Sequence, residues 1–246
     1  MNRRNGIGIF VLVGLTLVPT GSNAGEWGLG VGVAAQQPPQ EGADNQVVAL
    51  PFPSYQGERL SLDFASIAYA LAKTDRFQFA IEGQLRFDGY DPDESKALAG
   101  LEERDVTLDA GFSITVGDAW GVASLKVMAD ALGVHKGYEI SASYQYPMQF
   151  DRWTVMPGIK ASWPSAELVR YYYGVTLDEA TADRPAYSGR SVMNASAAIN
   201  TAYQLTDSWE IIGGAEYTHL GDGITDSPII ATDHEVIMYT AIVYRF

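Results

Sequence analysis

The chain has 246 residues, a formal net charge of −14 and no cysteine. Such an acidic surface excludes nucleic acid as a partner because it repels phosphates, and a chain without cysteine forms no disulfide and carries no lipid anchor on a cysteine. Hydrophobic residues make up 47% of the chain, which excludes a disordered protein.

The first 24 residues have the pattern of a signal peptide. Arg3 and Arg4 precede an apolar run from Ile7 to Val18, and the small residues Ser22 and Ala24 stand where a signal peptidase reads the chain. We therefore expect cleavage after Ala24; the alternative is a retained membrane anchor. Removal of the two arginines makes the mature chain, residues 25–246, more acidic still.

Beyond Ala24 the sequence has no apolar run of about 18 residues, the length that a membrane-spanning helix requires. Two options remain for an exported chain of this composition. One is a soluble periplasmic or secreted β-protein. The other is a closed barrel in the outer membrane, which has no edge strands and so satisfies every backbone group.

Segments with a two-residue period recur along the whole mature chain. In the segment 235–246 one face is formed by Val236, Met238, Thr240, Ile242, Tyr244 and Phe246. A continuous lipid-compatible face opposite a mixed face is typical of a membrane β-strand. The other segments are 27–33, 46–55, 60–64, 67–73, 77–87, 105–116, 123–131, 138–146, 153–163, 193–205 and 209–218.

Two of these segments are irregular. Pro51 and Pro53 interrupt the segment 46–55, and proline within a sheet is confined to edges, strand ends or bulges. The stretch 57–73 forms either one strand or two, depending on whether the chain turns between Phe64 and Ala68. An even number of strands, which outer-membrane barrels have, favours two.

The connections alternate between short and long. The short ones are 74–76, 117–119, 150–152 and 206–208, and the long ones are 89–103, 164–190 and 221–234. Aromatic residues gather at the strand ends, as in interfacial girdles. These features predict an all-β protein: a transmembrane antiparallel up-and-down barrel of about twelve strands, with short periplasmic turns and long external loops.

The faces opposite the apolar ones carry charges of both signs, which a barrel directs into its lumen. The residues are Glu82, Arg86, Asp105, Asp109, Lys126, Asp130, Glu139, Lys160, Glu210 and Glu216. They form either a network of ion pairs that fills the lumen or a lining whose excess of carboxylates favours cations.

The sequence offers little for catalysis. Its three histidines are His135, His219 and His234, and their spacing does not resemble a set of metal ligands. Asp233 and His234 form a candidate general-base pair, but such a dipeptide in a loop is usually solvated surface. We predict no catalytic residue, no metal and no cofactor.

The most distinctive stretch is Tyr171-Tyr172-Tyr173-Gly174-Val175, followed by Glu179 and Tyr187. Three consecutive tyrosines pack over the barrel mouth as a folded-in cap or form an exposed binding platform. The stretch Asp226-Ser227-Pro228-Ile229-Ile230 in the last external loop is a candidate packing partner.

With these residues in view, the chain resembles the MipA/OmpV family of outer-membrane proteins, named for the MltA-interacting protein. The resemblance rests on W-G-L-G-V-G at 27–32, L-P-F-P-S-Y-Q-G at 50–57, Y-Y-Y-G-V with Glu179 at 171–179, T-D-S-P at 225–228 and the terminal Y-R-F. Tyr244 and Phe246 in the last strand are the aromatic signal that barrel-insertion machinery is expected to read.

The resemblance implies a barrel without enzymatic activity that contacts outer-membrane lipid. It further implies a scaffold role in peptidoglycan (murein) synthesis, with a lytic transglycosylase and a penicillin-binding protein as partners that approach the short periplasmic turns. The alternatives are a small-solute channel that prefers cations and a surface protein linked to adhesion or stress.

Overall fold

The computed structural model describes residues 25–246. The predicted signal peptide and its cleavage site at Ala24 lie outside this range. Within it, the strands are β1 (Glu26–Gln37), β2 (Gln46–Gln56), β3 (Leu60–Leu62), β4 (Ser66–Lys73), β5 (Phe77–Arg86), β6 (Thr107–Asp118), β7 (Gly121–Asp130), β8 (Tyr138–Gln145), β9 (Met148–Phe150), β10 (Trp153–Pro164), β11 (Asn194–Gln204), β12 (Trp209–His219) and β13 (His234–Arg245).

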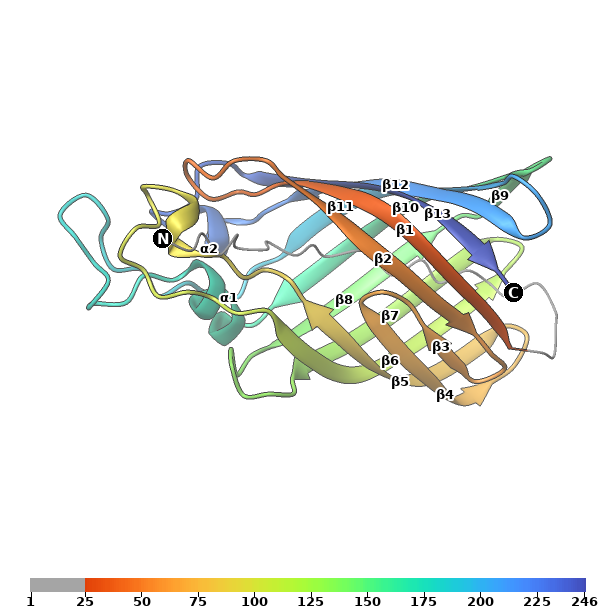
Figure 1. The fold of residues 1–246 in the computed structure, drawn as a ribbon. Coiled ribbons are helices and arrows are strands. Elements are labelled where there is room, and N and C mark those ends of the chain that lie inside the picture. The colour runs from red at the N-terminus through yellow and green to blue at the C-terminus, as the bar shows by residue number, and fades with distance from the viewer. Residues whose placement is uncertain (1–24) are drawn as a thin grey trace.

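The strands between residues 25 and 246 form one antiparallel sheet that closes on itself. β13 pairs with β1, and β10 pairs with β11, so the sheet has no free end. β8 and β9 both pair with β10 and follow each other along the same position in the wall. The thirteen strands between residues 25 and 246 therefore occupy twelve strand positions around the barrel. Figure 1 shows them tilted along the barrel axis, with the C-terminus at the end that carries the short turns. The predicted fold is confirmed.

The outer surface of the wall is apolar because the surrounding solvent is hydrocarbon. On β1, for example, the outward-facing side chains of Trp27, Leu29 and Val31 are each more than half exposed. Cross-strand aromatic pairs ring the end that carries the short turns, as an interfacial girdle requires. These pairs are Trp27–Tyr55, Trp120–Tyr144, Trp153–Tyr203 and Trp209–Tyr244. This end is the periplasmic one.

The stretch 57–73 contains two strands, as the even strand number requires. The turn between β3 and β4 is held by Asp63, whose carboxylate accepts hydrogen bonds from the backbone amides of Ala65 and Ser66 at 2.8 Å each. Its own amide donates to the carbonyl of Ser66 at 2.9 Å. A three-residue β3 and an early turn leave this hairpin shorter than its neighbours.

Some boundaries differ from those predicted. Gly117 and Asp118 belong to β6, and the turn follows at 119–120, before Gly121 with φ +116°. Phe87 does not continue the outward face of β5, because the strand ends at Arg86; its side chain is buried. The segment 164–190 contains a helix, α1 (Ala166–Tyr173), which alternation could not reveal.

One sector of the inner wall is apolar. Ala34, Leu50, Phe52, Ala241 and Val243 form a buried cluster on β1, β2 and β13. Gly32 makes room for it: a Cβ at this position would lie 2.5 Å from Ala241 Cβ and 2.7 Å from the ring of Phe52. Gly32 thus leaves space for large side chains inside a narrow barrel.

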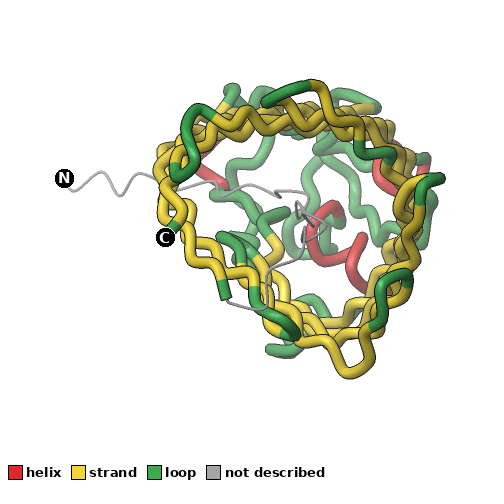
Figure 2. Tube along the Cα trace, turned by 90° about the vertical axis from the view of Figure 1, so that its right-hand side faces the viewer, coloured by secondary structure: helices red, strands yellow, loops and turns green. Residues whose placement is uncertain are grey.

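The long loops fold into the extracellular end of the barrel. We call this region the cap: α1, the short helix α2 (Asp222–Thr225), the 3₁₀ turn η1 (Pro92–Glu94) and loops 87–106, 174–193 and 220–233. Viewed along the axis, the helices and loops lie within the ring of strands (Figure 2). None of the helices among residues 25–246 is long and apolar enough to span a membrane.

Candidate functional site

The tyrosine triplet lies on α1, at the centre of the cap. The helix begins where the side chain of Ser165 accepts a hydrogen bond from the amide of Leu168, a standard N-cap. An eight-residue helix is too short to be stable alone and depends on the face that it buries. That face consists of Leu168, Val169, Tyr172 and Tyr173.

The three tyrosines have different environments. Tyr172 is fully buried, and its hydroxyl lies 3.0 Å from Thr107 Oγ1. Tyr171 is partly exposed, and its hydroxyl accepts a hydrogen bond from the amide of Asp105 at 3.1 Å. Burial raises the pKa of the Tyr172 and Tyr173 hydroxyls well above the usual range, so both remain neutral. The structure thus places the triplet in a folded-in cap.

Gly174 is the C-cap of α1, and Val175 begins the loop that follows the helix. A Cβ at Gly174 would lie 2.2 Å from the carbonyl oxygen of Arg170, so only glycine fits there. Val175 and Tyr187 exchange two backbone hydrogen bonds, of 2.7 and 2.9 Å. The Tyr187 hydroxyl donates to the carbonyl of Gly223 at 2.9 Å, which joins this loop to α2.

Glu179 joins two loops. Its Oε1 accepts from Arg104 Nη2 at 2.8 Å and from the amide of Glu102 at 2.9 Å, and its Oε2 accepts from the amide of Thr176 at 2.8 Å. Burial alone would raise the pKa of the carboxyl, but these hydrogen bonds outweigh burial and lower it to about 2. Glu179 is therefore a buried anion that ties the loop before β6 to the loop after α1.

The stretch 226–230 packs against α1. Ser227 is buried, and its hydroxyl donates to the carbonyl of Tyr173 at 2.6 Å. Ile229 is buried in a cluster with Tyr90, Leu98, Leu101 and Val175. Asp226 faces outward and pairs with Arg190 at 3.0 Å, with both side chains more than half exposed. Pro228 follows Ser227 in the same turn.

Below the cap, the barrel holds a polar cavity of about 200 Å³. Six carboxylates and three basic side chains line it. They are Glu82, Asp88, Asp109, Glu139, Glu216 and Glu235, with Arg86, Lys126 and Lys160. Each basic group is paired: Lys126 lies 2.6 Å from Glu82, Lys160 2.9 Å from Glu216, and Arg86 2.8 Å from both Asp88 and Asp109.

Three of the predicted lumen residues do not line this cavity. Asp105 is exposed in the cap, because the chain enters β6 only at Thr107. Asp130 binds the amides of the loop after β7, and Glu210 pairs with Arg245 at the periplasmic end. Glu235, which alternation had placed on a mixed face, joins the cavity lining.

The histidines lie in two places. His135 is buried, with Nε2 2.8 Å from Asp109 Oδ1 and Nδ1 accepting from the amide of Gly137 at 3.1 Å, so Nε2 carries the proton. His135 thus fixes the loop after β7 to Asp109 on β6. The sequence analysis missed this contact, since nothing in the sequence links the loop at 135 to Asp109. Asp233 and His234 lie 2.9 Å apart where the exposed last loop meets β13, which begins at His234, one residue earlier than predicted, and the hydrogen bond from His234 lowers the pKa of Asp233.

The last strand ends where the sequence predicted the assembly signal. Phe246 is 74% exposed, and its amide donates to the carbonyl of Trp27 at 2.9 Å, while Tyr244 stacks edge-on against it. Recognition of these aromatic residues by insertion machinery stays a prediction.

The closed wall, the apolar belt and the aromatic ring define an integral β-barrel of the bacterial outer membrane. A sequence model of the MltA-interacting protein MipA matches residues 28–246, and the chain belongs to this family. It is 27% identical over 227 residues to the outer membrane protein Omp26La of Vibrio anguillarum, covering 92% of this chain and 88% of that protein.

Two further relatives cover similar shares. OmpV of Vibrio cholerae is 26% identical, over 92% of this chain and 88% of its own. The MltA-interacting protein of Escherichia coli K12 is 27% identical, over 90% of this chain and 91% of its own. The family resemblance and the outer-membrane localisation predicted from the sequence are confirmed.

Proposed function

We propose that this protein is a non-enzymatic interaction protein of the outer membrane whose periplasmic rim binds a lytic transglycosylase of the murein synthesis machinery. The name of the Escherichia coli relative, MltA-interacting protein, supports the partner. The cap at the extracellular end and the ion pairs beneath it support a role at the surface of the barrel.

One corner of the periplasmic rim carries the proposal. The β9–β10 hairpin and the β11–β12 turn extend beyond the neighbouring turns in Figure 1. Arg152 joins them: its Nη1 donates to the carbonyl of Leu205 at 3.2 Å, and its own carbonyl accepts from the amide of Gln204 at 2.9 Å. Phe150 at the tip is 57% exposed and Leu205 is 41% exposed.

An exposed aromatic residue and an exposed leucine, next to an arginine that hydrogen-bonds from one turn to the other, have the composition of a small interface centre. The turn at 74–76 carries polar residues, and Trp120 in the turn at 119–120 stacks on Tyr144. A penicillin-binding protein, the second partner that the family resemblance implies, would contact the complex from the same side.

The test is capture of a purified lytic transglycosylase by the detergent-solubilised barrel. We expect Phe150→Ser with Leu205→Ser to weaken capture about tenfold or more, the loss typical of two interface anchors. The matched control, Thr74→Ser with Asp75→Asn on another turn, should retain it. Unchanged capture by the Phe150 and Leu205 variant would contradict the proposal.

A second candidate function is a cation-preferring channel, which the excess of carboxylates over basic groups in the cavity favours. Planar-bilayer recordings separate the two. The interaction protein should show no steady conductance, whereas the channel should conduct cations and lose that preference when Glu139 is replaced by Gln. Turnover that disappears in His234→Ala would instead indicate an enzyme.

A further inference from the structure

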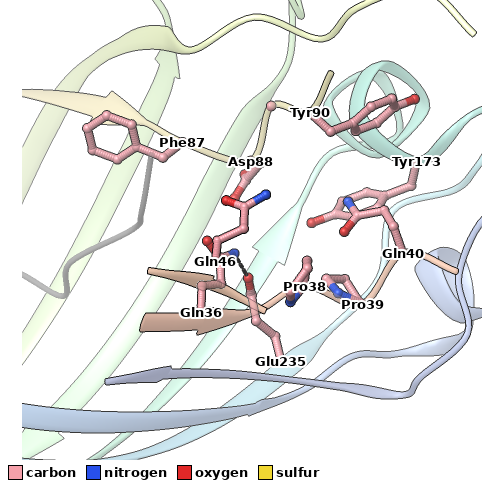
Figure 3. A pocket seen from close by; sticks show the side chains of 11 residues that line it. Gln36, Pro38, Pro39, Gln40, Gln46, Phe87, Asp88, Tyr90, Tyr173 and Glu235 are labelled. Atoms are coloured by element: carbon pink, nitrogen blue, oxygen red, sulfur yellow. Dashed lines mark hydrogen bonds between the residues drawn. The ribbon is translucent and has the colours of Figure 1, made fainter. Parts of the chain in front are cut away.

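A small cavity lies at the extracellular edge of the lumen, and we call it the cleft. Its volume is about 20 Å³, and it is bordered by the end of β1, the loop that follows, the chain after β5, the end of α1 and the beginning of β13 (Figure 3). Asp88, Tyr173 and Glu235 line both the cleft and the larger polar cavity beneath the cap. The cleft is therefore a point where strands of the wall and segments of the cap meet.

The lining of the cleft is rich in oxygen and carries no basic group. Two carboxylates, three primary amides and a phenol face it, and no lysine, arginine or histidine among residues 25–246 lines it. The six side chains are Asp88, Glu235, Gln36, Gln40, Gln46 and Tyr173. Oxygen donors with an excess of negative charge favour a hard metal cation and disfavour an anion or an apolar ligand.

Both carboxylates keep one oxygen available for a ligand. Asp88 Oδ2 accepts from Arg86 Nη1 at 2.8 Å, and Glu235 Oε1 accepts from the side-chain amide of Gln36. The other oxygen of each carboxylate has no hydrogen-bond partner among residues 25–246. Arg86 balances the charge of Asp88 only in part, because it also contacts two further carboxylates. A cation in the cleft would contact both carboxylates without breaking either hydrogen bond.

Two neutral side chains of the cleft are buried without a partner. Tyr173 is 8% exposed and Gln40 is 9% exposed. Figure 3 shows the hydroxyl of the first and the amide of the second directed into the space that Asp88 and Glu235 border. Neither the hydroxyl nor the side-chain amide hydrogen-bonds to a residue in the range 25–246. Because burial of a polar group without a partner is unfavourable, Tyr173 and Gln40 point to a species held in the cleft.

The volume and charge of the cleft select among the species that could fill it. A space of about 20 Å³ holds one water-sized body. A water molecule or a monovalent ion would leave the charge of the two carboxylates unbalanced. Mg²⁺ retains several of its own waters and requires near-octahedral geometry, for which this volume has no room. Ca²⁺ accepts about six to eight oxygen ligands in irregular geometry, carboxylates and amide carbonyls among them, and the lining of the cleft fits this description.

We propose that the cleft binds one Ca²⁺ ion. Its charged ligands are Asp88 and Glu235, and its neutral ligands include the side-chain oxygens of Gln40 and Tyr173. Glu235 belongs to β13 in the wall, whereas Asp88 and Tyr173 belong to the cap, so the ion ties the folded-in loops to the barrel. The site lies at the opposite end of the barrel from the proposed periplasmic interaction and does not depend on it.

The test is calorimetric titration with Ca²⁺ of the full mature chain, folded in detergent and freed of metal ions by a chelator. We expect saturable binding of one ion per chain. Glu235→Gln preserves the size of the side chain and removes one of two charged ligands, so the affinity should fall about tenfold or more. Gln40→Leu, in a loop outside the strands, should weaken binding about threefold or more. The matched control is Glu41→Gln, which removes the same charge from the exposed neighbour of Gln40 and should leave the affinity unchanged.

Limited proteolysis supplies a second readout, since a bound ion should protect loop 87–106 in the wild type and in Glu41→Gln but not in Glu235→Gln. Heat-modifiable migration in gel electrophoresis shows that each variant is folded. Mg²⁺ should displace Ca²⁺ only at concentrations about tenfold or more higher. The proposal would be overturned if the folded wild type bound no Ca²⁺ saturably, if Mg²⁺ were equally potent, if folded Glu235→Gln and Gln40→Leu kept the wild-type affinity, or if Glu41→Gln lost as much affinity as they do.

Discussion

The wall and the cap of this barrel place their apolar residues in opposite directions. In the wall, residues such as Leu29 and Ile159 face outward and are about 60% exposed, while the charged groups face inward. In the cap, Tyr172, Leu168 and Ile224 are buried within the loops. The wall is held chiefly by its closed ladder of backbone hydrogen bonds, whereas the cap is held by side-chain packing, as in a water-soluble domain.

The largest effect expected from this difference is at the centre of the cap. Tyr172→Ala should cost about 3–5 kcal/mol of cap stability, because it removes a fully buried aromatic ring. Limited proteolysis of loops 87–106 and 174–193 should accelerate, while heat-modifiable migration of the barrel stays as in the wild type. If the variant lost both the protease resistance of the loops and the heat-modifiable migration of the barrel, wall and cap would unfold as one cooperative unit.

Two exposed apolar residues, one on the wall and one in the cap, test whether each region faces lipid or water. Ile159 on the wall is 63% exposed and Leu177 in the cap is 86% exposed. Ile159→Arg should destabilise the barrel by about 2–4 kcal/mol, as a charge on the lipid face does, and Leu177→Arg should change it by about 0.5 kcal/mol at most. Urea unfolding in lipid vesicles measures both; equal effects would contradict an apolar belt around Ile159.

The cap should also respond to acid through Glu179. The pKa of Glu179 is lowered from 4.5 to about 2 in the folded protein. Its contribution to the stability of the cap is therefore complete above pH 4.5 and is lost as the pH falls toward 2. Glu179→Gln should remove about 1.5–3 kcal/mol of cap stability at neutral pH, since it weakens charge-assisted hydrogen bonds. Protease sensitivity of the loops between pH 5 and 2 should then change less in the variant than in the wild type.

The smallest effect concerns the surface of the cap. The Arg190–Asp226 pair is more than half exposed, so Asp226→Asn should alter cap stability by about 1 kcal/mol or less. The neighbouring Ser227→Ala, which removes a buried hydrogen bond to Tyr173, should cost more, about 1 to 2 kcal/mol. Limited proteolysis at the same pH compares the cap stability of the two variants. A larger loss in Asp226→Asn than in Ser227→Ala would show that the turn is held chiefly by Asp226.

The wall was predictable from the sequence because lipid imposes a two-residue period on each strand separately. Even the two strands in 57–73 followed from the need for an even number. The cap was not predictable to the same degree. Arg104 and Glu179 are 75 positions apart, and α1 is too short for its pattern to stand out. The sequence singled out Tyr171–Tyr173 and 226–230 and offered the folded-in cap as one of two arrangements.

The inward turn of Phe64 and Phe87 marks another limit. Both fit an outward alternation in the sequence, and only the ends of β5 and the β3–β4 hairpin redirect them. A pattern within a strand holds only as far as the strand does, so residues at its ends follow local turn geometry.

The mutual ties among loops 87–106, 174–193 and 220–233 bear on how a cell carrying this protein is recognised from outside. Their exposed residues come from distant parts of the chain and keep their spacing because contacts such as those of Glu179 and Ser227 hold the loops together. We therefore expect antibodies or phage that bind intact bacteria to see a discontinuous epitope, and sera raised against the denatured chain to miss it.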